Sequence, residues 1–161
     1  MTEEEHKSGR KNATEKTALV TAVDYLARQA HSEKKLREKL QRKGFPQEEI
    51  DAAIERLIER KYLDDADLCA QQFMYLYNES RYSVRQIFVK LMQRGFDKEL
   101  IRSAVPPDTA EREAAAAERV LIMKFKPTDK KQKMMANLYQ KGFSVDTAHA
   151  AVRNFTEGAE A

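Results

Sequence analysis

Leu40-Gln-Arg-Lys-Gly44-Phe45 is a stretch whose pattern occurs three times in this chain of 161 residues. It returns as Leu91-Met-Gln-Arg-Gly95-Phe96 and as Leu138-Tyr-Gln-Lys-Gly142-Phe143, so the shared pattern is Leu-x-x-[Lys/Arg]-Gly-Phe. The three copies are spaced by 51 and 47 residues. A period of this size is typical of tandem structural repeats. The sequence therefore predicts that the chain consists of three copies of one unit.

The pattern predicts the end of a helix. Glycine just past a helix adopts the left-handed conformation easily because it has no Cβ, and it closes the helix as a Schellman turn. In that turn the leucine and the phenylalanine occupy the two positions whose side chains touch. The basic residue before each glycine suits the negative end of the helix dipole.

Capping residues place the start of each of these middle helices. Ser32 and Ser83 stand eight residues before the first two leucines, and Ser83 is followed by Gln86 at the spacing of a capping box. In the third copy Asp129 is the expected N-cap, with Gln132 at the same spacing. Each middle helix is thus expected to run for ten or eleven residues.

Two further helices are expected around each middle one. A third helix begins after each Gly-Phe pair, and a longer first helix covers 17–30, 65–78 and 108–124 in the successive copies. No stretch alternates apolar and polar residues over the length of a strand. The predicted fold is all-α, with three tandem three-helix repeats stacked into an elongated, curved, solenoid-like chain. The predicted boundaries are 16–63, 64–107 and 108–156, between disordered tails at 1–15 and 157–161.

Composition excludes several classes of protein. No run of 18 apolar residues is present, so no membrane span is expected, and the polar N-terminus does not resemble a secretory signal. Cys69 is the only cysteine, which excludes an internal disulfide; we expect it to be buried as a small apolar residue. A cytoplasmic protein is expected.

Catalytic and cofactor chemistry is not indicated either. The five glycines form no cluster that could cradle a phosphate, so neither a P-loop nor a dinucleotide fingerprint exists. His6, His31 and His149 have no second ligand at metal-binding spacing. The acidic run at 64–67 precedes a helix, where carboxylates cap free N–H groups. No triad or paired-carboxylate site is present, and no enzyme, metal or cofactor is expected.

Positive charge recurs at the middle helix. Residues 32–43 carry six basic and two acidic side chains, residues 81–94 four and none, and residues 124–141 six and one, although the whole chain has a net charge of only +3. If the repeats stack regularly, these helices form a basic track that suits a phosphate backbone or an acidic protein groove. The candidate contact residues are Lys34, Lys35, Arg37, Arg42, Lys43, Arg85, Lys90, Arg94, Lys130, Lys131 and Lys133.

A solvated helix face is the alternative explanation of this charge. A single charged helix is usually only that, but three equivalent helices with one sign favour a function. Nothing in the pattern selects the edges of nucleobases, so sequence-specific DNA readout is not indicated. Tyr75, Tyr77, Tyr82 and Tyr139 could stack on bases, but we expect them mainly to pack between helices.

Four segments resemble the bacterial RecX regulatory proteins, which act on the recombinase RecA. They are Tyr25-Leu-Ala-Arg-Gln-Ala-His-Ser-Glu-Lys-Lys-Leu-Arg-Glu-Lys-Leu40, Gly44-Phe45, Tyr62-Leu-Asp-Asp65 and the closing Val152-Arg-Asn-Phe155. The resemblance covers residues 17 to 155. It implies a cytoplasmic, non-enzymatic and monomeric protein that binds the groove of the RecA–DNA filament. It also implies inhibition of filament growth and of RecA's ATPase, strand-exchange and co-protease activities, with weaker, non-specific binding to single- and double-stranded DNA.

Two other classes of function remain open from the residues alone. One is a direct DNA-binding protein built from tandem homeodomain-like helices, which would bind naked DNA tightly and with strong salt dependence. The other is a helical scaffold that binds only proteins. The modulator differs from both because it should bind DNA weakly and still inhibit RecA strongly.

Overall fold

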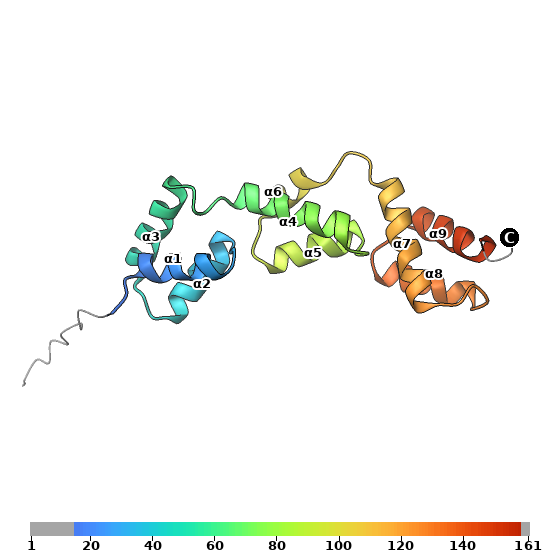
Figure 1. Cartoon of the computed structure of the whole chain (residues 1–161), viewed down its shortest axis with the longest axis horizontal. Helices are drawn as coiled ribbons and strands as arrows, with labels where there is room; N and C mark the ends of the chain where they lie inside the picture. The colour runs from blue at the N-terminus through green and yellow to red at the C-terminus, as the bar shows by residue number, and fades with distance from the viewer. Residues whose placement is uncertain (1–14, 159–161) are drawn as a thin grey trace, which may run out of the picture.

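The computed structural model describes residues 15–158 as a row of helical units along the long axis of the molecule (Figure 1). Within these residues there are nine helices and no strand, so the predicted all-α repeat fold is confirmed. The tail predicted at 1–15 lies outside this range apart from Glu15, and α9 runs on to Glu157. The helices are α1 (Ala18–Arg28), α2 (Glu33–Arg42), α3 (Gln47–Glu59), α4 (Asp65–Glu79), α5 (Val84–Gln93), α6 (Lys98–Ala104), α7 (Ala110–Lys124), α8 (Lys131–Gln140) and α9 (Val145–Glu157).

All three middle helices, α2, α5 and α8, end in the predicted Schellman turn. Gly44, Gly95 and Gly142 have φ values of 89°, 92° and 88°. In the first copy the N–H of Phe45 donates to the Leu40 carbonyl at 3.3 Å, and the N–H of Gly44 donates to the Gln41 carbonyl at 2.9 Å. The same two bonds recur in the other copies. The left-handed glycine is therefore confirmed at each position.

The predicted caps are right in two repeats and wrong in the third. The Ser32 hydroxyl accepts the Lys35 N–H, and Ser83 forms the full capping box with Gln86. Asp129 does not cap α8: its carboxylate accepts the Lys126 N–H at 2.8 Å and so closes the turn before the helix. Lys130 takes the N-cap position without a side-chain bond.

Each repeat has its own hydrophobic core. The first is built around Leu36, Leu40 and Ile54, the second around Phe73, Ile87 and Leu91, and the third around Leu121, Met134 and Leu138, all fully buried. Cys69 is buried in the second core as predicted, and burial raises the pKa of its thiol. The three apolar clusters share no member, so the repeats are held together by other contacts.

A serine hydroxyl connects each repeat to the next. The Ser32 Oγ donates to the Arg94 carbonyl at 2.5 Å, while it accepts the Lys35 N–H at 3.3 Å. In the same way the Ser83 Oγ donates to the Lys141 carbonyl at 2.5 Å. Each N-cap serine therefore satisfies its own helix and also the last turn of the middle helix in the following repeat.

A carboxylate supplies the second bond of each joint. The N–H of Glu33 donates to Asp65 Oδ1 at 2.9 Å, and the N–H of Val84 donates to Glu113 Oε1 at 3.1 Å. These N–H groups belong to the first turn of α2 and α5, which has no helical acceptor. We name the two contacts joint 1, between the first and second repeats, and joint 2, between the second and third.

Joint 2 contains an additional buried cation. Arg112 has 15% of its side chain exposed and pairs with Glu113 at 2.8 Å. Its guanidinium also donates to the carbonyls at the C-terminal end of α4 and lies 4.7 Å from the centre of the Tyr77 ring. The carbonyl acceptors are those of Leu76, Tyr77, Ser80 and Tyr82.

Both joints require glycine for a second reason besides its φ angle. A Cβ built on Gly95 would lie 2.6 Å from the Ser32 Oγ, and one on Gly142 would lie 2.9 Å from the Arg85 Cβ. Among the described residues, a Cβ on Gly44 would meet nothing within 4 Å. The three glycines thus share a conformation but differ in their surroundings.

This difference predicts unequal costs for the same substitution. We expect Gly44→Ala to lower the free energy of unfolding by about 1–2 kcal/mol, the cost of a left-handed alanine. Gly95→Ala should cost a further 1–3 kcal/mol, roughly, because its Cβ displaces Ser32 from joint 1. Urea unfolding of the two variants measures the difference. Equal losses would show that the close approach at joint 1 is not required.

A second prediction isolates the hydroxyl of the joint. Ser32→Ala removes an N-cap, worth about 1 kcal/mol, and the donor to the Arg94 carbonyl, worth about 1 kcal/mol more. Ser144→Ala is the matched control, because Ser144 caps α9 through the Thr147 N–H without contacting another repeat. Thermal and urea unfolding should show the larger loss for Ser32→Ala, and identical losses would contradict the joint.

Candidate nucleic-acid interface

The two joints place the middle helices end to end (Figure 1). The N-terminus of α2 meets the C-terminus of α5, and the N-terminus of α5 meets the C-terminus of α8. The positive end of each helix dipole therefore faces the negative end of the next. The basic residues of the three helices consequently follow one another from helix to helix along the chain of joints, and we call this series the basic row.

Joint 1 brings three of the candidate residues together. A Cβ on Gly95 would lie 3.1 Å from the Lys34 Cβ and 3.5 Å from the Lys35 Cγ, and Arg94 directly precedes this glycine. Lys34 is exposed and makes no ion pair within residues 15–158. The Arg94 guanidinium donates to Gln72 Oε1 at 2.9 Å. Two repeats therefore contribute cations to one place.

Acidic side chains offset part of the charge of α2. Arg37 pairs with Glu33 at 3.2 Å and with Asp51 at 2.5 Å. The hydrogen bond to Asp51 is the main cause of the raised pKa of Arg37, and the same bond lowers the pKa of Asp51. Lys35 pairs with Glu38 at 3.3 Å. Among the candidates of α2, Arg37 is thus already engaged by the fold.

Joint 2 borders a hollow without acidic groups. The hollow has a volume of about 550 Å³ and lies between α5 and α8. The candidates Arg85 and Lys90 line it together with Lys141, which sequence reasoning counted in the charge of α8 but did not select. Its position before the repeated glycine was the signal that could have identified it. The remaining lining residues are Tyr82, Gln86, Val89, Gln93, Tyr139, Gln140 and Gly142.

The other candidates lie at the two ends of the row. Lys130, Lys131 and Lys133 are exposed around the N-terminus of α8. Arg42 and Lys43 are exposed at the C-terminus of α2. Apart from Arg37, which pairs with Asp51, the candidates therefore form an extended series of four groups and not a single compact site.

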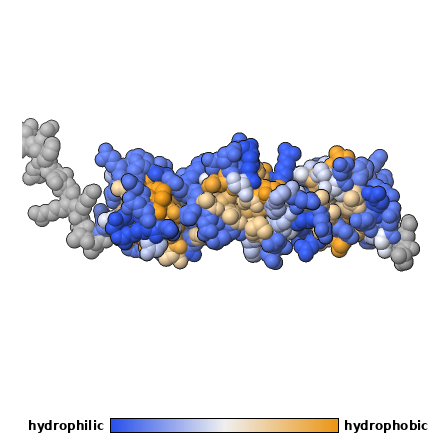
Figure 2. All heavy atoms as spheres, turned by 90° about the horizontal axis from the view of Figure 1, so that it is seen from above, coloured by the Kyte–Doolittle hydropathy of each residue, from blue (hydrophilic) through white to orange (hydrophobic). Residues whose placement is uncertain are grey.

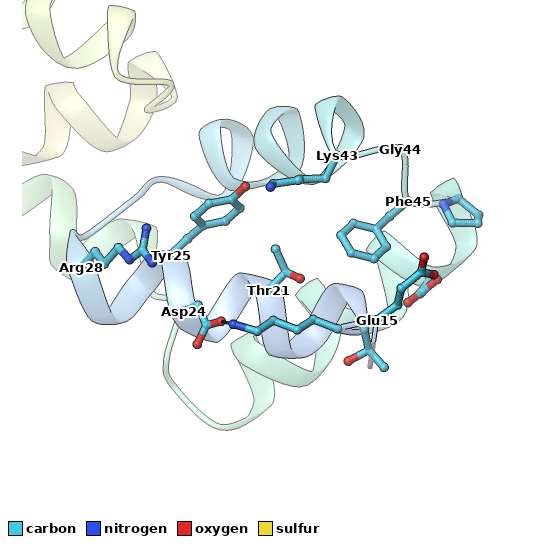
Figure 3. A pocket seen from close by; sticks show the side chains of 12 residues that line it. Glu15, Thr21, Asp24, Tyr25, Arg28, Lys43, Gly44 and Phe45 are labelled. Atoms are coloured by element: carbon cyan, nitrogen blue, oxygen red, sulfur yellow. Dashed lines mark hydrogen bonds and ion pairs between the residues drawn. The ribbon is translucent and has the colours of Figure 1, made fainter. Parts of the chain in front are cut away.

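The open end at Gly44 has a different electrostatic character (Figure 3). A hollow of about 590 Å³ lies between α1 and the Gly44 turn, on the face that a preceding repeat covers in the other two copies. On its α1 side Lys16 pairs with Asp24 at 2.6 Å, and this hydrogen bond lowers the pKa of Asp24. Its lining balances three basic residues (Lys16, Arg28, Lys43) with three acidic ones (Glu15, Asp24, Glu49).

Tyrosine packing is only partly as predicted. Tyr77 stacks on Phe73 with ring centres 5.6 Å apart, and the Lys90 ammonium lies 4.6 Å from the centre of the Tyr82 ring. Tyr75 and Tyr139 instead remain 68% and 42% exposed. The face seen in Figure 2 is largely hydrophilic, with separated hydrophobic patches.

The described part of the chain offers no metal centre. Within residues 15–158 no three His, Cys, Asp or Glu side chains come close enough to hold a metal ion. His31 is buried between the Gln29 carbonyl, 2.6 Å from Nδ1, and the Lys39 ammonium, 2.7 Å from Nε2. Because the carbonyl can only accept and the ammonium can only donate, this geometry fits the neutral ring with its proton on Nδ1. In the described residues, no helix has the length and apolar character needed to cross a membrane.

Comparison with known proteins agrees with this architecture. The sequence model of "RecX, first three-helix domain" matches residues 18–57, which include α1 and α2 and most of α3. The chain is 32% identical over 142 residues to a regulatory protein RecX of Chlorobaculum tepidum, covering 85% of this chain and 87% of that one. The chain belongs to the RecX family. It is also 30% identical over 138 residues to the regulatory protein RecX of Caldanaerobacter subterraneus, covering 85% and 70% of the two chains.

A solved RecX structure has the same fold. The crystal structure of RecX from Lactobacillus salivarius superposes with a TM-score of 0.73 at 20% identity, covering 86% of this chain and 94% of that chain. At this level of identity the similarity concerns the fold alone. The relatives in the RecX family are named regulatory proteins and not enzymes, in agreement with the expectation from the sequence.

The half-buried Asp65 gives joint 1 a pH dependence. Burial raises the pKa of its carboxyl above 3.8, against the opposing effect of the Glu33 N–H bond. The folded chain therefore binds the proton of the Asp65 carboxyl more tightly than the unfolded chain does. The stability that this proton contributes is lost as the pH rises through the raised pKa. Asp65→Asn keeps an acceptor oxygen but does not titrate.

We therefore expect the free energy of unfolding of Asp65→Asn to rise relative to that of the parent protein as the pH increases from below 3.8. The difference between the two proteins should level off above the raised pKa. Urea unfolding of both proteins across this pH series measures it. Other carboxylates, such as Asp51, are common to both proteins and cancel in the comparison. A difference that does not vary with pH would contradict the burial of Asp65.

Proposed function

We propose that this protein binds in the groove of the RecA–DNA filament and inhibits filament growth, and with it the ATPase, strand-exchange and co-protease activities of RecA. The observation that supports the proposal is that two joints bring the middle helices end to end, with basic candidate residues at both joints and at both ends of the series. Membership of the RecX family, whose relatives are named regulatory proteins, supports a regulatory role. The protein acts in the cytoplasm as a monomer, without a cofactor.

The dimensions of the row suit an extended polyanion. Three helices of ten residues each supply about 45 Å of helix at 1.5 Å per residue. Cations spread over this length follow the phosphates of a nucleic acid, and their binding releases condensed counterions. No side chain of the row is arranged to read base edges, so binding does not depend on sequence.

The distribution of charge favours a filament over naked DNA as the target. Each group in the row supplies only two or three cations, and carboxylates already engage Arg37 and Lys35. Contacts this sparse give weak affinity for DNA alone, since each neutralised phosphate contributes separately. Protein contacts with RecA on either side of the row supply the remaining affinity.

Charge reversal of the row tests the proposal. We expect Lys34→Glu with Lys35→Glu, Arg85→Glu with Lys90→Glu, and Lys130→Glu with Lys131→Glu each to keep the helical circular dichroism of the parent. In a RecA–single-stranded-DNA ATPase assay each double variant should need about tenfold more protein for half inhibition. The slope of log affinity against log salt should decrease by about one unit per lost phosphate contact.

The matched control reverses two exposed cations on third helices, Lys98→Glu on α6 and Arg153→Glu on α9, which lie outside the row. It should inhibit RecA as well as the parent does. If the three row variants also inhibit normally, the row is only a solvated surface. If the parent itself leaves the RecA ATPase unchanged, the proposed function is wrong.

A further inference from the structure

The surroundings of joint 2 differ from those of joint 1 in net charge. Counting from the repeated glycines, Val89 of α5 corresponds to Glu38 of α2, the acid that pairs with Lys35 at 3.3 Å. With valine at this position, no carboxylate lines the hollow of joint 2. Within residues 15–158, Arg85, Lys90 and Lys141 make no ion pair. The hollow therefore has uncompensated positive charge.

Two repeats supply this charge, from opposite sides of the hollow. Arg85 lies on the first turn of α5, and its Cβ would be 2.9 Å from a Cβ on Gly142. Lys141 is the residue before that glycine, and its carbonyl is held by Ser83. Because joint 2 fixes both backbones, Arg85 and Lys141 already line the same hollow before any ligand binds.

An aromatic face accompanies the cations. Tyr139 has the place that Met92 occupies in joint 1, and it is 42% exposed at the hollow. Within residues 15–158 no other ring and no cation stacks on it, whereas Tyr82 is covered by the Lys90 ammonium at 4.6 Å. Cations next to an available aromatic face are the combination used to bind single-stranded nucleic acid.

The other hollows lack this combination. The one at the Gly44 end balances its basic and acidic residues. A third, between the C-terminal parts of α4 and α7, combines the exposed apolar residues Ile122 and Met123 with Arg81, Arg119 and Glu79. Tyr82 also lines it, but the Lys90 ammonium covers that ring. This hollow contains one acid, and its exposed apolar side chains are aliphatic. Of the four hollows described within residues 15–158, the one at joint 2 alone combines net positive charge with an uncovered ring.

We propose that the hollow at joint 2 binds single-stranded DNA, with a phosphate between Arg85 and Lys141 and an unpaired base stacked on Tyr139. The inference rests on the proposed function in that DNA is the ligand, and it adds the place and the type of strand. Duplex DNA has no unpaired base to offer Tyr139, so the stacking contact selects the single strand. Each stacked base of this kind contributes about 1–3 kcal/mol.

Tyr139→Trp provides a direct probe, because the chain has no other tryptophan. Titration of this variant with a short oligothymidylate should quench the indole fluorescence as a base stacks on it. Tyr75→Trp, at a 68% exposed position on α4 outside the hollow, is the matched control and should not be quenched. An abasic oligonucleotide should bind, measured by anisotropy of a label on the DNA, without quenching either variant.

Adding Arg85→Glu or Lys141→Glu to the Tyr139→Trp protein should weaken oligothymidylate binding about tenfold or more, while circular dichroism stays unchanged. Lys34→Glu at joint 1 should have a smaller effect, because the adjacent charge there is partly offset. Equal quenching of both tryptophans, or equal quenching by oligothymidylate and by duplex, would overturn the inference. So would an unchanged affinity in both charge variants.

The RecA assay separates this inference from the proposed function. If oligothymidylate does not quench Tyr139→Trp while the same protein inhibits the RecA ATPase normally, the site at joint 2 is wrong and the proposed function stands. If the quenching occurs as expected but neither the parent nor the variant inhibits RecA, the proposed function is wrong and the DNA site stands.

Discussion

The architecture depends on one contact, in which a serine hydroxyl donates to the last carbonyl of the next middle helix. The glycine beside this contact has no Cβ and so leaves room for it. The approach is so close that any side chain at Gly95 would meet Ser32. It orders the middle helices in one line, because the N-terminus of each is held against the C-terminus of the next. It also explains why the repeats need no shared apolar core: the joint satisfies backbone groups that a helix end would otherwise leave without partners.

The same contact gives part of the positive charge a structural cause. Lys43, Arg94 and Lys141 stand at the C-cap, where a cation stabilises the negative end of the helix dipole. Stability alone therefore favours a basic residue before each glycine. It does not favour Arg85 or Lys34 on the first turn of a helix, where the dipole disfavours cations. These first-turn residues are consequently the stronger sign of an anionic partner, and in each joint they lie beside the C-cap cation of the neighbouring repeat.

Local features of the fold were predictable from the sequence, and contacts between distant residues were not. The Schellman turns and the caps at Ser32 and Ser83 follow from residues at most five positions apart, which is why the helix order and the repeat could be inferred. The predicted cap at Asp129 was wrong because its carboxylate accepts the N–H of Lys126, which precedes it, and not an N–H of the first turn of α8. At the candidate site, counting charge overestimated Arg37, since its partner Asp51 lies on the next helix. It also passed over Lys141, whose neighbours at joint 2 come from another repeat.

Because the repeats have separate cores and are joined by a few polar bonds, each repeat is a rigid unit and each joint is a hinge. Each block is stiffened by its own interdigitated apolar side chains, whereas a joint contains a serine bond, a carboxylate bond and, at one of the two, the Arg112 clamp. Bending is therefore concentrated at two hinges of unequal stiffness, with the softer one between the first and second blocks. A rod of this kind adjusts its contour to a helical surface by small rotations at the hinges, and the blocks themselves keep their internal packing.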